Sequence, residues 1–226
     1  RLMFDAAHAF GCTYKMRAIG GFGDAEVLSF HSTKVLNSFE GGAVVTNNDE
    51  LAEKIRLMKN FGFAGHDKVI YIGINGKMSE ISAAMGITSL ESFGDFVEIN
   101  RKNYDCYRRE LEGIPGVRLV KYDKNEKNNY QYVIIEIDKK TAGLSRNTVH
   151  DRLWAENVLC RRYFYPCCHR MEPYQSLYPM AGKILPVTEG MADRVLALPT
   201  GTAVSVSAVK KICRLLKGIF RGAGEE

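Results

Sequence analysis

The sequence predicts an α/β fold in which a layered sheet-and-helix part, residues 1–94, is followed by a smaller α+β part, residues 95–226. Two observations carry this prediction. Short apolar runs alternate with stretches of helical periodicity through the first part, which is the pattern of a layered α/β sheet. After Gly113 the character changes, and strand-like runs lie between helical stretches as in an α+β arrangement.

The composition indicates a folded chain with one large domain or two small ones. Of the 226 residues, 46% are hydrophobic and 25% are charged, which excludes disordered, collagen-like and coiled-coil chains. No run approaches the ~18 consecutive apolar residues that a membrane helix needs. The net charge of +5 suits a small anionic ligand, but it is too mild and too dispersed to favour nucleic acid.

Three strands and two helices are expected in the first part, and a third helix begins the second part. Glycines and polar residues interrupt short apolar runs, which predicts strands at 2–5, 25–30 and 43–46. The run Asn47-Asn48-Asp49 offers an N-cap, and helical periodicity continues from there to Asn60, before Gly62. Two further helices are expected over 79–93 and about 95–111.

The second part is expected to hold a small sheet and further helices. Its predicted strands cover 116–121, 129–137 and 158–164. Ser145 or Asn147 caps a helix that runs to about Glu156, and Ser205 or Ser207 caps a last helix. One face of the last helix is apolar and the other basic. We expect the basic face to be solvated on a packed helix, and binding at a membrane surface is the alternative.

The six cysteines are irregularly spaced, and no C-x-x-C occurs. In a chain of this length they are expected to be reduced thiols, which predicts a cytoplasmic protein. Cys167, Cys168 and His169 are adjacent, but no second pair of ligands lies at zinc-like spacing, so no metal site is predicted.

Polar residues follow two of the predicted strands in the first part. Asp5 and His8 come after the first strand, and Ser29 and Lys34 come at and after the second. Ligands of open α/β sheets bind at the carboxyl ends of strands, so these side chains are candidates for a charged cofactor. A pocket lysine can act as a nucleophile toward carbonyls. Taken singly, these residues favour a structural interpretation, because a lone lysine is usually a surface residue and an aspartate after a strand is usually part of a turn or a cap.

Three motifs in order favour the cofactor. Residues 5–11 match D-x-A-[HQ]-A-x-G, residues 29–34 match S-F-[HFY]-x-x-K with E-G-G at 40–42, and residues 73–80 match G-x-N-x-[RK]-M-S-E. The chain thereby resembles the DegT/DnrJ family of pyridoxal-phosphate-dependent sugar aminotransferases over essentially its whole length. The resemblance implies the last part of a fold type I PLP-transferase large domain, followed by the small C-terminal domain.

The resemblance also implies a role for each motif residue. Lys34 forms a Schiff base with pyridoxal 5'-phosphate and moves the substrate proton, and Asp5 pairs with the pyridine nitrogen. His8 lies at the ring near the phenolic oxygen, and Ser29 binds the phosphate. Asn75 reaches the phosphate of a neighbouring subunit, which implies a homodimer with shared active sites. No role is assigned to His31 or Glu40.

The implied reaction is transfer of an amino group, with glutamate as donor, to a nucleotide-linked keto-sugar. Family relatives that dehydrate sugars carry His in place of the lysine, so Lys34 favours transamination. Gly76, the Ser89-Leu90 pair and residues 167–169 depart from the family pattern. These departures leave the sugar open, and both cell-surface polysaccharide and antibiotic sugars are compatible.

Members of the family begin with a long segment that supplies part of the cofactor site, and Arg1 follows no such segment here. We therefore expect this chain to correspond to the C-terminal portion of the family's architecture, and we leave open the activity of that portion alone. Two other interpretations remain. The chain could be a truncated, non-catalytic relative that acts as a binding or regulatory domain, or a cofactor-free domain in which the motifs are coincidental.

Overall fold

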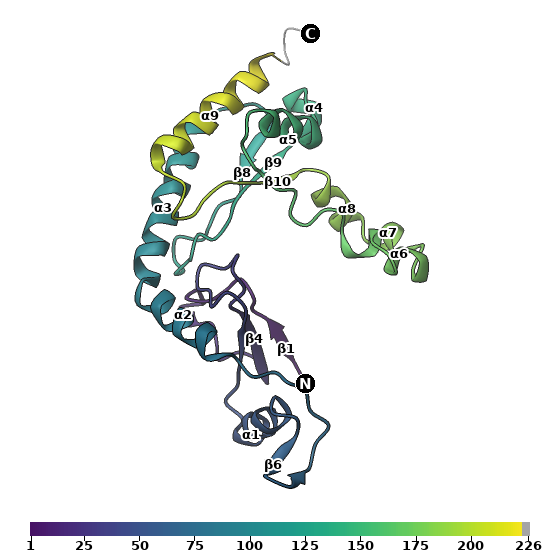
Figure 1. Ribbon diagram of the computed structural model, residues 1–226. Helices are drawn as coiled ribbons and strands as arrows, with labels where there is room; N and C mark the ends of the chain where they lie inside the picture. Colours follow the sequence, from purple (N-terminus) through teal and green to yellow (C-terminus); the bar gives the residue numbers. More distant parts are fainter. Residues whose placement is uncertain (223–226) are drawn as a thin grey trace. The chain divides into compact units, whose positions relative to one another are not determined.

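A computed structural model describes residues 1–222 as a mixture of helices and short β-sheets (Figure 1). The chain divides into two compact units. The first unit contains residues 1–98 and 123–131, and the second contains residues 99–122 and the chain from 132 onward. The change from one unit to the other falls within helix α3 (Phe93–Glu110). The predicted domain boundary after residue 94 lies in the same helix and remains a prediction.

A three-stranded sheet forms the centre of the first unit. Its strands are β1 (Met3–Asp5), β4 (Ala25–Ser29) and β5 (Gly42–Val45), in the order β1-β4-β5. Strand β1 runs parallel to β4, and β5 runs antiparallel to β4 (Figure 1). Because β1 and β4 are parallel neighbours, Asp5 and Ser29 both lie at the carboxyl ends of their strands, at one edge of the sheet.

Helices and two small hairpins complete the first unit. Helix α1 (Asp49–Met58) is capped by the Asn48 side chain, which accepts a hydrogen bond from the Leu51 N–H. Helix α2 (Glu80–Glu91) is capped in the same way by Ser79. The cap of α1 lies within the predicted run Asn47-Asn48-Asp49, and α2 lies within the helix predicted over 79–93. The hairpins were not predicted; their strands are β2 (Thr13–Tyr14) with β3 (Arg17–Ala18), and β6 (Phe63–Gly65) with β7 (Lys68–Val69).

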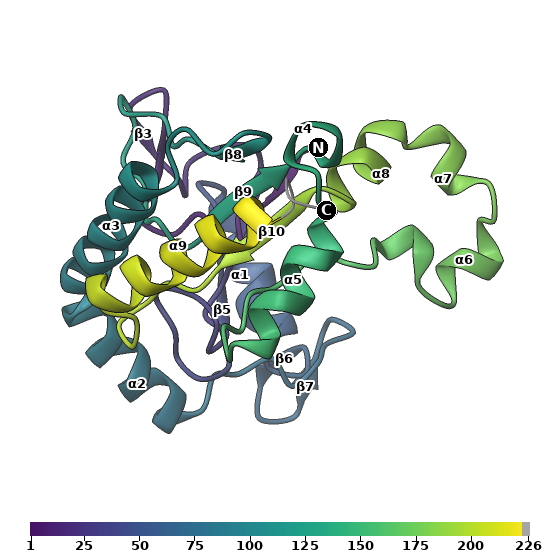
Figure 2. The same ribbon diagram turned by 90° about the horizontal axis from the view of Figure 1, so that it is seen from above.

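The second unit is built on an antiparallel sheet of order β10-β9-β8. The strands are β8 (Val117–Leu119), β9 (Val133–Ile137) and β10 (Val195–Leu198). Helices α5 (Arg146–Ala155) and α9 (Val206–Arg221) lie side by side next to strands β9 and β10 (Figure 2). Ser145 and Ser205 cap these two helices, so the first of the two predicted candidates is correct in each case. Among residues 1–222, no helix combines the length and apolar character needed to cross a bilayer.

The core of the second unit follows the predicted periodicities. Val133, Ile135 and Ile137 alternate toward the interior from β9, and Val209 and Leu216 are buried from α9. Tyr107 of α3 is fully buried among them, and its hydroxyl donates a hydrogen bond to the Pro199 carbonyl at 2.9 Å. Burial of this phenol raises its pKa far above the ordinary value, so it remains protonated.

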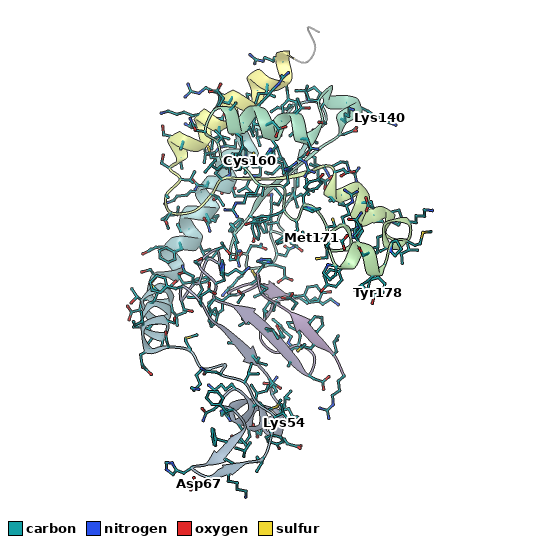
Figure 3. The ribbon with its side chains drawn as sticks, turned by 45° about the vertical axis from the view of Figure 1, so that its right-hand side comes forward. Lys54, Asp67, Lys140, Cys160, Met171 and Tyr178 are labelled. Atoms are coloured by element: carbon teal, nitrogen blue, oxygen red, sulfur yellow. The ribbon has the colours of Figure 1, made fainter. Side chains whose placement is uncertain are left out.

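Five short helices lie between β9 and β10 in the sequence, and none of them was predicted. They are α4 (Lys139–Ala142), η1 (Cys168–Arg170), α6 (Tyr174–Leu177), α7 (Ala181–Ile184) and α8 (Pro186–Ala192). Figure 3 labels Met171 and Tyr178 on this stretch, and both side chains are exposed. Isolated helices of one or two turns depend on local contacts rather than on periodicity, so the sequence gives them little signal.

Two predicted strands are corrected. The predicted strand at 158–164 reduces to a single bridge, in which the N–H and carbonyl of Arg161 pair with Ala197. The predicted strand at 129–137 begins only at Val133. Tyr130 has a positive φ of 51°, which is incompatible with extended pairing, and the Asn129 side chain is engaged elsewhere in the first unit.

Candidate active site

The candidate site is built at the edge of the first sheet where β1 and β4 end. Asp5 is the last residue of β1 and is exposed, and Ser29 is the last residue of β4 and is half-buried. Lys34 lies in the turn that follows β4, where its N–H donates to the His31 carbonyl at 2.9 Å. The topology thus places the residues of the first two motifs on adjacent strand ends.

The pKa of His8 depends on the charges of both Asp5 and Lys34. The pKa of His8 lies below its ordinary value, chiefly because the imidazole is partly buried. The positive charge of Lys34 lowers this pKa further, and the negative charge of Asp5 acts in the opposite direction. Both side chains therefore act on His8 through their charges. Because its pKa is lowered, the imidazole is predominantly uncharged at neutral pH.

The loop that carries His8 is fixed by its own backbone. Asp5 Oδ1 accepts a hydrogen bond from the Ala7 N–H at 3.1 Å, and the Ala9 N–H donates to the Ala6 carbonyl at 2.9 Å. The Phe10 ring makes edge contacts with the rings of Phe30 and Phe93, at centroid distances of 5.9 and 5.2 Å. A short turn anchored at both ends therefore presents His8.

Gly11 closes this turn, and we expect Gly11→Ala to destabilise the first unit. Gly11 has a φ of +76°, and an added Cβ would lie 2.5 Å from the Phe93 ring. Backbone strain and overpacking together predict a loss of about 2–4 kcal/mol in the free energy of unfolding, measured by urea titration. Gly113→Ala is the matched control, because Gly113 has a φ of +80° and nothing within 4 Å of the added Cβ. Equal losses in the two variants would contradict the steric part of this argument.

The turn between β4 and β5 is braced by residues to which the sequence assigned no role. His31 Nδ1 bonds to Thr33 Oγ1 at 2.9 Å, and its Nε2 lies 3.7 Å from Glu40 Oε1. The His31 N–H donates to Ser29 Oγ at 3.3 Å, which leaves the Ser29 hydroxyl hydrogen for another acceptor. His31 and Glu40 therefore shape the turn that carries Lys34.

Asn75 lies on a different segment of the first unit. It forms an isolated bridge with Asn60, next to the end of α1, and its Oδ1 accepts from Lys77 Nζ at 2.7 Å. Lys77 in turn lies over the Phe61 ring, 4.1 Å from the centroid. The structure does not join Asn75 to the Asp5, His8 and Lys34 group. Its implied role toward a neighbouring subunit remains a prediction.

Asn129 contacts the loop that carries His8, and the sequence did not indicate this contact. Its side-chain amide donates to the His8 carbonyl at 2.8 Å and to the Phe10 carbonyl at 3.1 Å. The two partners are separated by about 120 residues along the chain, and the residues around Asn129 were read as a strand. No local pattern signals such a contact.

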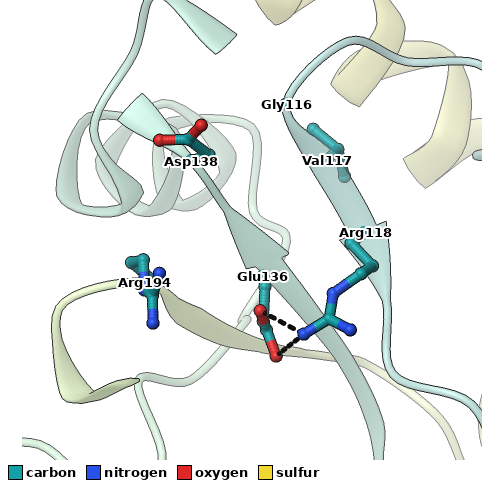
Figure 4. A pocket seen from close by; sticks show the side chains of 6 residues that line it. All are labelled: Gly116, Val117, Arg118, Glu136, Asp138 and Arg194. Carbon is teal, nitrogen blue, oxygen red and sulfur yellow. Dashed lines mark hydrogen bonds and ion pairs between the residues drawn. The ribbon is translucent and has the colours of Figure 1, made fainter. Parts of the chain in front are cut away.

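Two other polar clusters belong to the second unit. A cavity of about 290 Å³ is lined by Gly116, Val117, Arg118, Glu136, Asp138 and Arg194 (Figure 4). Arg118 Nη2 donates to both carboxylate oxygens of Glu136, at 2.8 and 2.7 Å, and Asp138 caps α4. His169 and Arg170 both contact the Glu189 carboxylate. The Glu136 and Glu189 carboxylates thus have basic partners within the second unit. Residues 1–222 contain no group of three potential ligands that could hold a metal ion.

Comparison with known proteins decides the family. The model of the DegT/DnrJ/EryC1/StrS aminotransferase family matches residues 1–217. This chain belongs to that family. The family assignment confirms the resemblance and, with it, the α/β fold class of the PLP-type transferases predicted from the motifs.

Named relatives of the chain are sugar aminotransferases. The chain is 36% identical to dTDP-4-amino-4,6-dideoxy-D-glucose transaminase of Shigella dysenteriae, over 97% of this chain and 59% of that protein. The solved structure of DesI in the presence of its TDP-sugar product is 47% identical, with a TM-score of 0.90, and covers 99% of this chain and 57% of DesI. DesV of S. venezuelae, solved with a ketimine intermediate, is 25% identical with a TM-score of 0.85, over 95% and 56% of the two chains. The chain therefore spans less than two thirds of the length of these relatives.

Proposed function

We propose that the protein to which this chain belongs is a pyridoxal-phosphate-dependent aminotransferase, and that this chain supplies its cofactor-binding lysine and carboxylate. The observation that carries the proposal is the placement of Asp5 and Ser29 at the carboxyl ends of two adjacent parallel strands, with Lys34 in the turn that follows the second. Family membership supports the same reaction class.

The donor set fits pyridoxal phosphate. A primary amine suits the cofactor aldehyde, a carboxylate suits a protonated pyridine nitrogen, and a hydroxyl with a free hydrogen suits a phosphate oxygen. Lys34, Asp5 and Ser29 provide these three groups at one edge of the first sheet. When bound, the cofactor supplies an electron sink that stabilises negative charge developing at the substrate carbon.

Each residue of the chain then has a defined task. Lys34 would hold the cofactor through its side-chain amine, and the same amine, when free, would move the proton at the substrate carbon. Asp5 keeps the proton on the ring nitrogen. His8, largely uncharged, would contact the cofactor ring, and Ser29 would bind the phosphate. We further propose that Asn75 completes the phosphate site of a neighbouring subunit in a homodimer.

The proposed substrate is a nucleotide-linked keto-sugar, and glutamate is the proposed amino donor. The names of the Shigella dysenteriae transaminase and the DesI complex support a deoxythymidine-diphosphate sugar. The net charge of +5 is compatible with a diphosphate ligand. The DesV complex supports amine–carbonyl chemistry in this family.

A panel experiment tests the function. The natural protein is incubated with pyridoxal phosphate and glutamate, and then with keto-sugars linked to deoxythymidine, guanosine or uridine diphosphate. We expect a visible absorption band from the bound cofactor, and an amino-sugar together with 2-oxoglutarate from at least one sugar, detected by mass spectrometry. A protein that gives neither the band nor an amino-sugar with any member of the panel is a non-catalytic relative, and the proposed function is wrong.

A further inference from the structure

Asn129 makes an unusual pair of contacts with the loop that presents His8. The side chain is only 4% exposed. Both partners of its amide nitrogen are backbone carbonyls on either side of Ala9, those of His8 at 2.8 Å and Phe10 at 3.1 Å. The amide oxygen accepts from the Gln131 N–H at 3.1 Å, so it is fixed in orientation. An amide used in this way holds a loop at two points.

The segment that contains Asn129 is itself fastened to the same region. Residues 123–131 belong to the first unit, although they lie between β8 and β9 of the second in sequence. The Lys127 N–H donates to Thr13 Oγ1 at 2.8 Å, and the Thr13 N–H donates to the Lys127 carbonyl at 3.1 Å. The Glu126 carboxylate accepts from the Thr13 hydroxyl and from the Met16 N–H. Residues 126–129 therefore form a series of hydrogen bonds to the region around residues 8–16, and Asn129 makes the bond to the loop at His8.

We propose that Asn129 is a positioning residue, which holds the His8 loop in its binding geometry before the cofactor arrives. A loop that is already ordered loses less conformational entropy on binding than a mobile one. Removing the amide leaves the His8 and Phe10 carbonyls without this partner and frees the turn to move. The consequence for cofactor binding rests on the proposed function, whereas the effect on His8 does not.

Asn128 provides a matched control, because its side-chain amide also donates to two backbone carbonyls but those carbonyls lie within its own segment. Its amide nitrogen donates to the carbonyls of Asp123 and Glu126, at 2.8 and 2.9 Å. These bonds hold the segment to itself and do not reach His8. Asn129→Ala and Asn128→Ala thus each remove two amide-to-carbonyl bonds from neighbouring positions, and only the first acts on the loop.

The first measurement is the NMR titration of the His8 imidazole in the natural protein purified without cofactor, with the signal assigned by His8→Gln. Burial and Lys34 hold the His8 pKa below its ordinary value. A released loop exposes the imidazole, so in Asn129→Ala we expect the pKa to rise toward about 6.5. Asn128→Ala is expected to leave it at the wild-type value. The signals of the histidines outside the loop, such as His31 and His150, report whether the fold is retained.

The second measurement is pyridoxal phosphate affinity, from the visible band. We expect Asn129→Ala to weaken binding about tenfold, with Asn128→Ala close to wild type. If His8 titrates identically in both variants, the positioning role is wrong. If Asn129→Ala does not fold, Asn129→Ser replaces it in the same comparison with the same criterion. If the wild-type protein forms no band, the proposed function fails, and the His8 titration still decides the role of Asn129.

Discussion

Replacing Lys34 with alanine is expected to abolish the visible band of the bound cofactor and to lower the transamination rate by about 10⁴-fold or more. Lys34 lies at the same sheet edge as Asp5 and close enough to His8 to lower its pKa. The amine acts both as the covalent anchor and as the group that moves the proton, so no neighbouring side chain replaces it. Stopped-flow absorbance and product formation with the best keto-sugar of the panel measure the two effects.

The variant Lys34→Arg distinguishes two contributions of Lys34, because arginine keeps the positive charge but lacks the nucleophilic amine. A guanidinium group stays protonated and does not attack the aldehyde, so this variant is expected to lack the band as fully as Lys34→Ala. The His8 titration distinguishes the two. Loss of the positive charge in Lys34→Ala raises the His8 pKa, whereas Lys34→Arg keeps a charge that lowers it. A Lys34→Arg protein that retains both band and activity would show that the lysine contributes only its charge.

The parts of the site that could be predicted from sequence depend on local signals. Asp5 and Ser29 were correctly placed at strand ends because short apolar runs bounded by polar residues mark their strands. The observed caps at Asn48, Ser145 and Ser205 are each among the candidates that the sequence offered, because a cap needs only one side chain and the next turn of backbone. The parallel pairing of β1 with β4, which brings Asp5 and Ser29 to one edge, follows from the fold class.

The parts that could not be predicted depend on contacts between distant residues. Residues 129–132 have the composition of a strand, but the Asn129 amide is used by a loop about 120 residues earlier. A positive φ at Tyr130 then turns the chain, so β9 begins at Val133. The run at 158–164 also has the composition of a strand, but its pairing with β10 is an isolated bridge between Arg161 and Ala197. Tertiary contacts decided these segments against their local propensity.

Asp5→Asn is expected to lower the transamination rate roughly 10²–10³-fold while leaving the protein folded. Asparagine keeps an oxygen that can accept the Ala7 N–H bond now made by Asp5 Oδ1, so the turn is preserved. It lacks the negative charge that holds a proton on the ring nitrogen. Asp24→Asn is the matched control, because Asp24 precedes β4 at the opposite end of the same strand pair, where its Oδ2 accepts the Leu2 N–H at 2.7 Å.

The His8 titration gives this prediction a second signature that does not depend on the cofactor. The charge of Asp5 raises the His8 pKa, so its removal is expected to lower that pKa, opposite in sign to the effect of Lys34→Ala. Asp24→Asn is expected to change neither the rate nor the His8 pKa. Asp5→Asn activity equal to that of Asp24→Asn would exclude Asp5 as the partner of the ring nitrogen. Shifts of opposite sign from Asp5 and Lys34 would place both charges beside the same imidazole, which is the arrangement that the proposed chemistry requires.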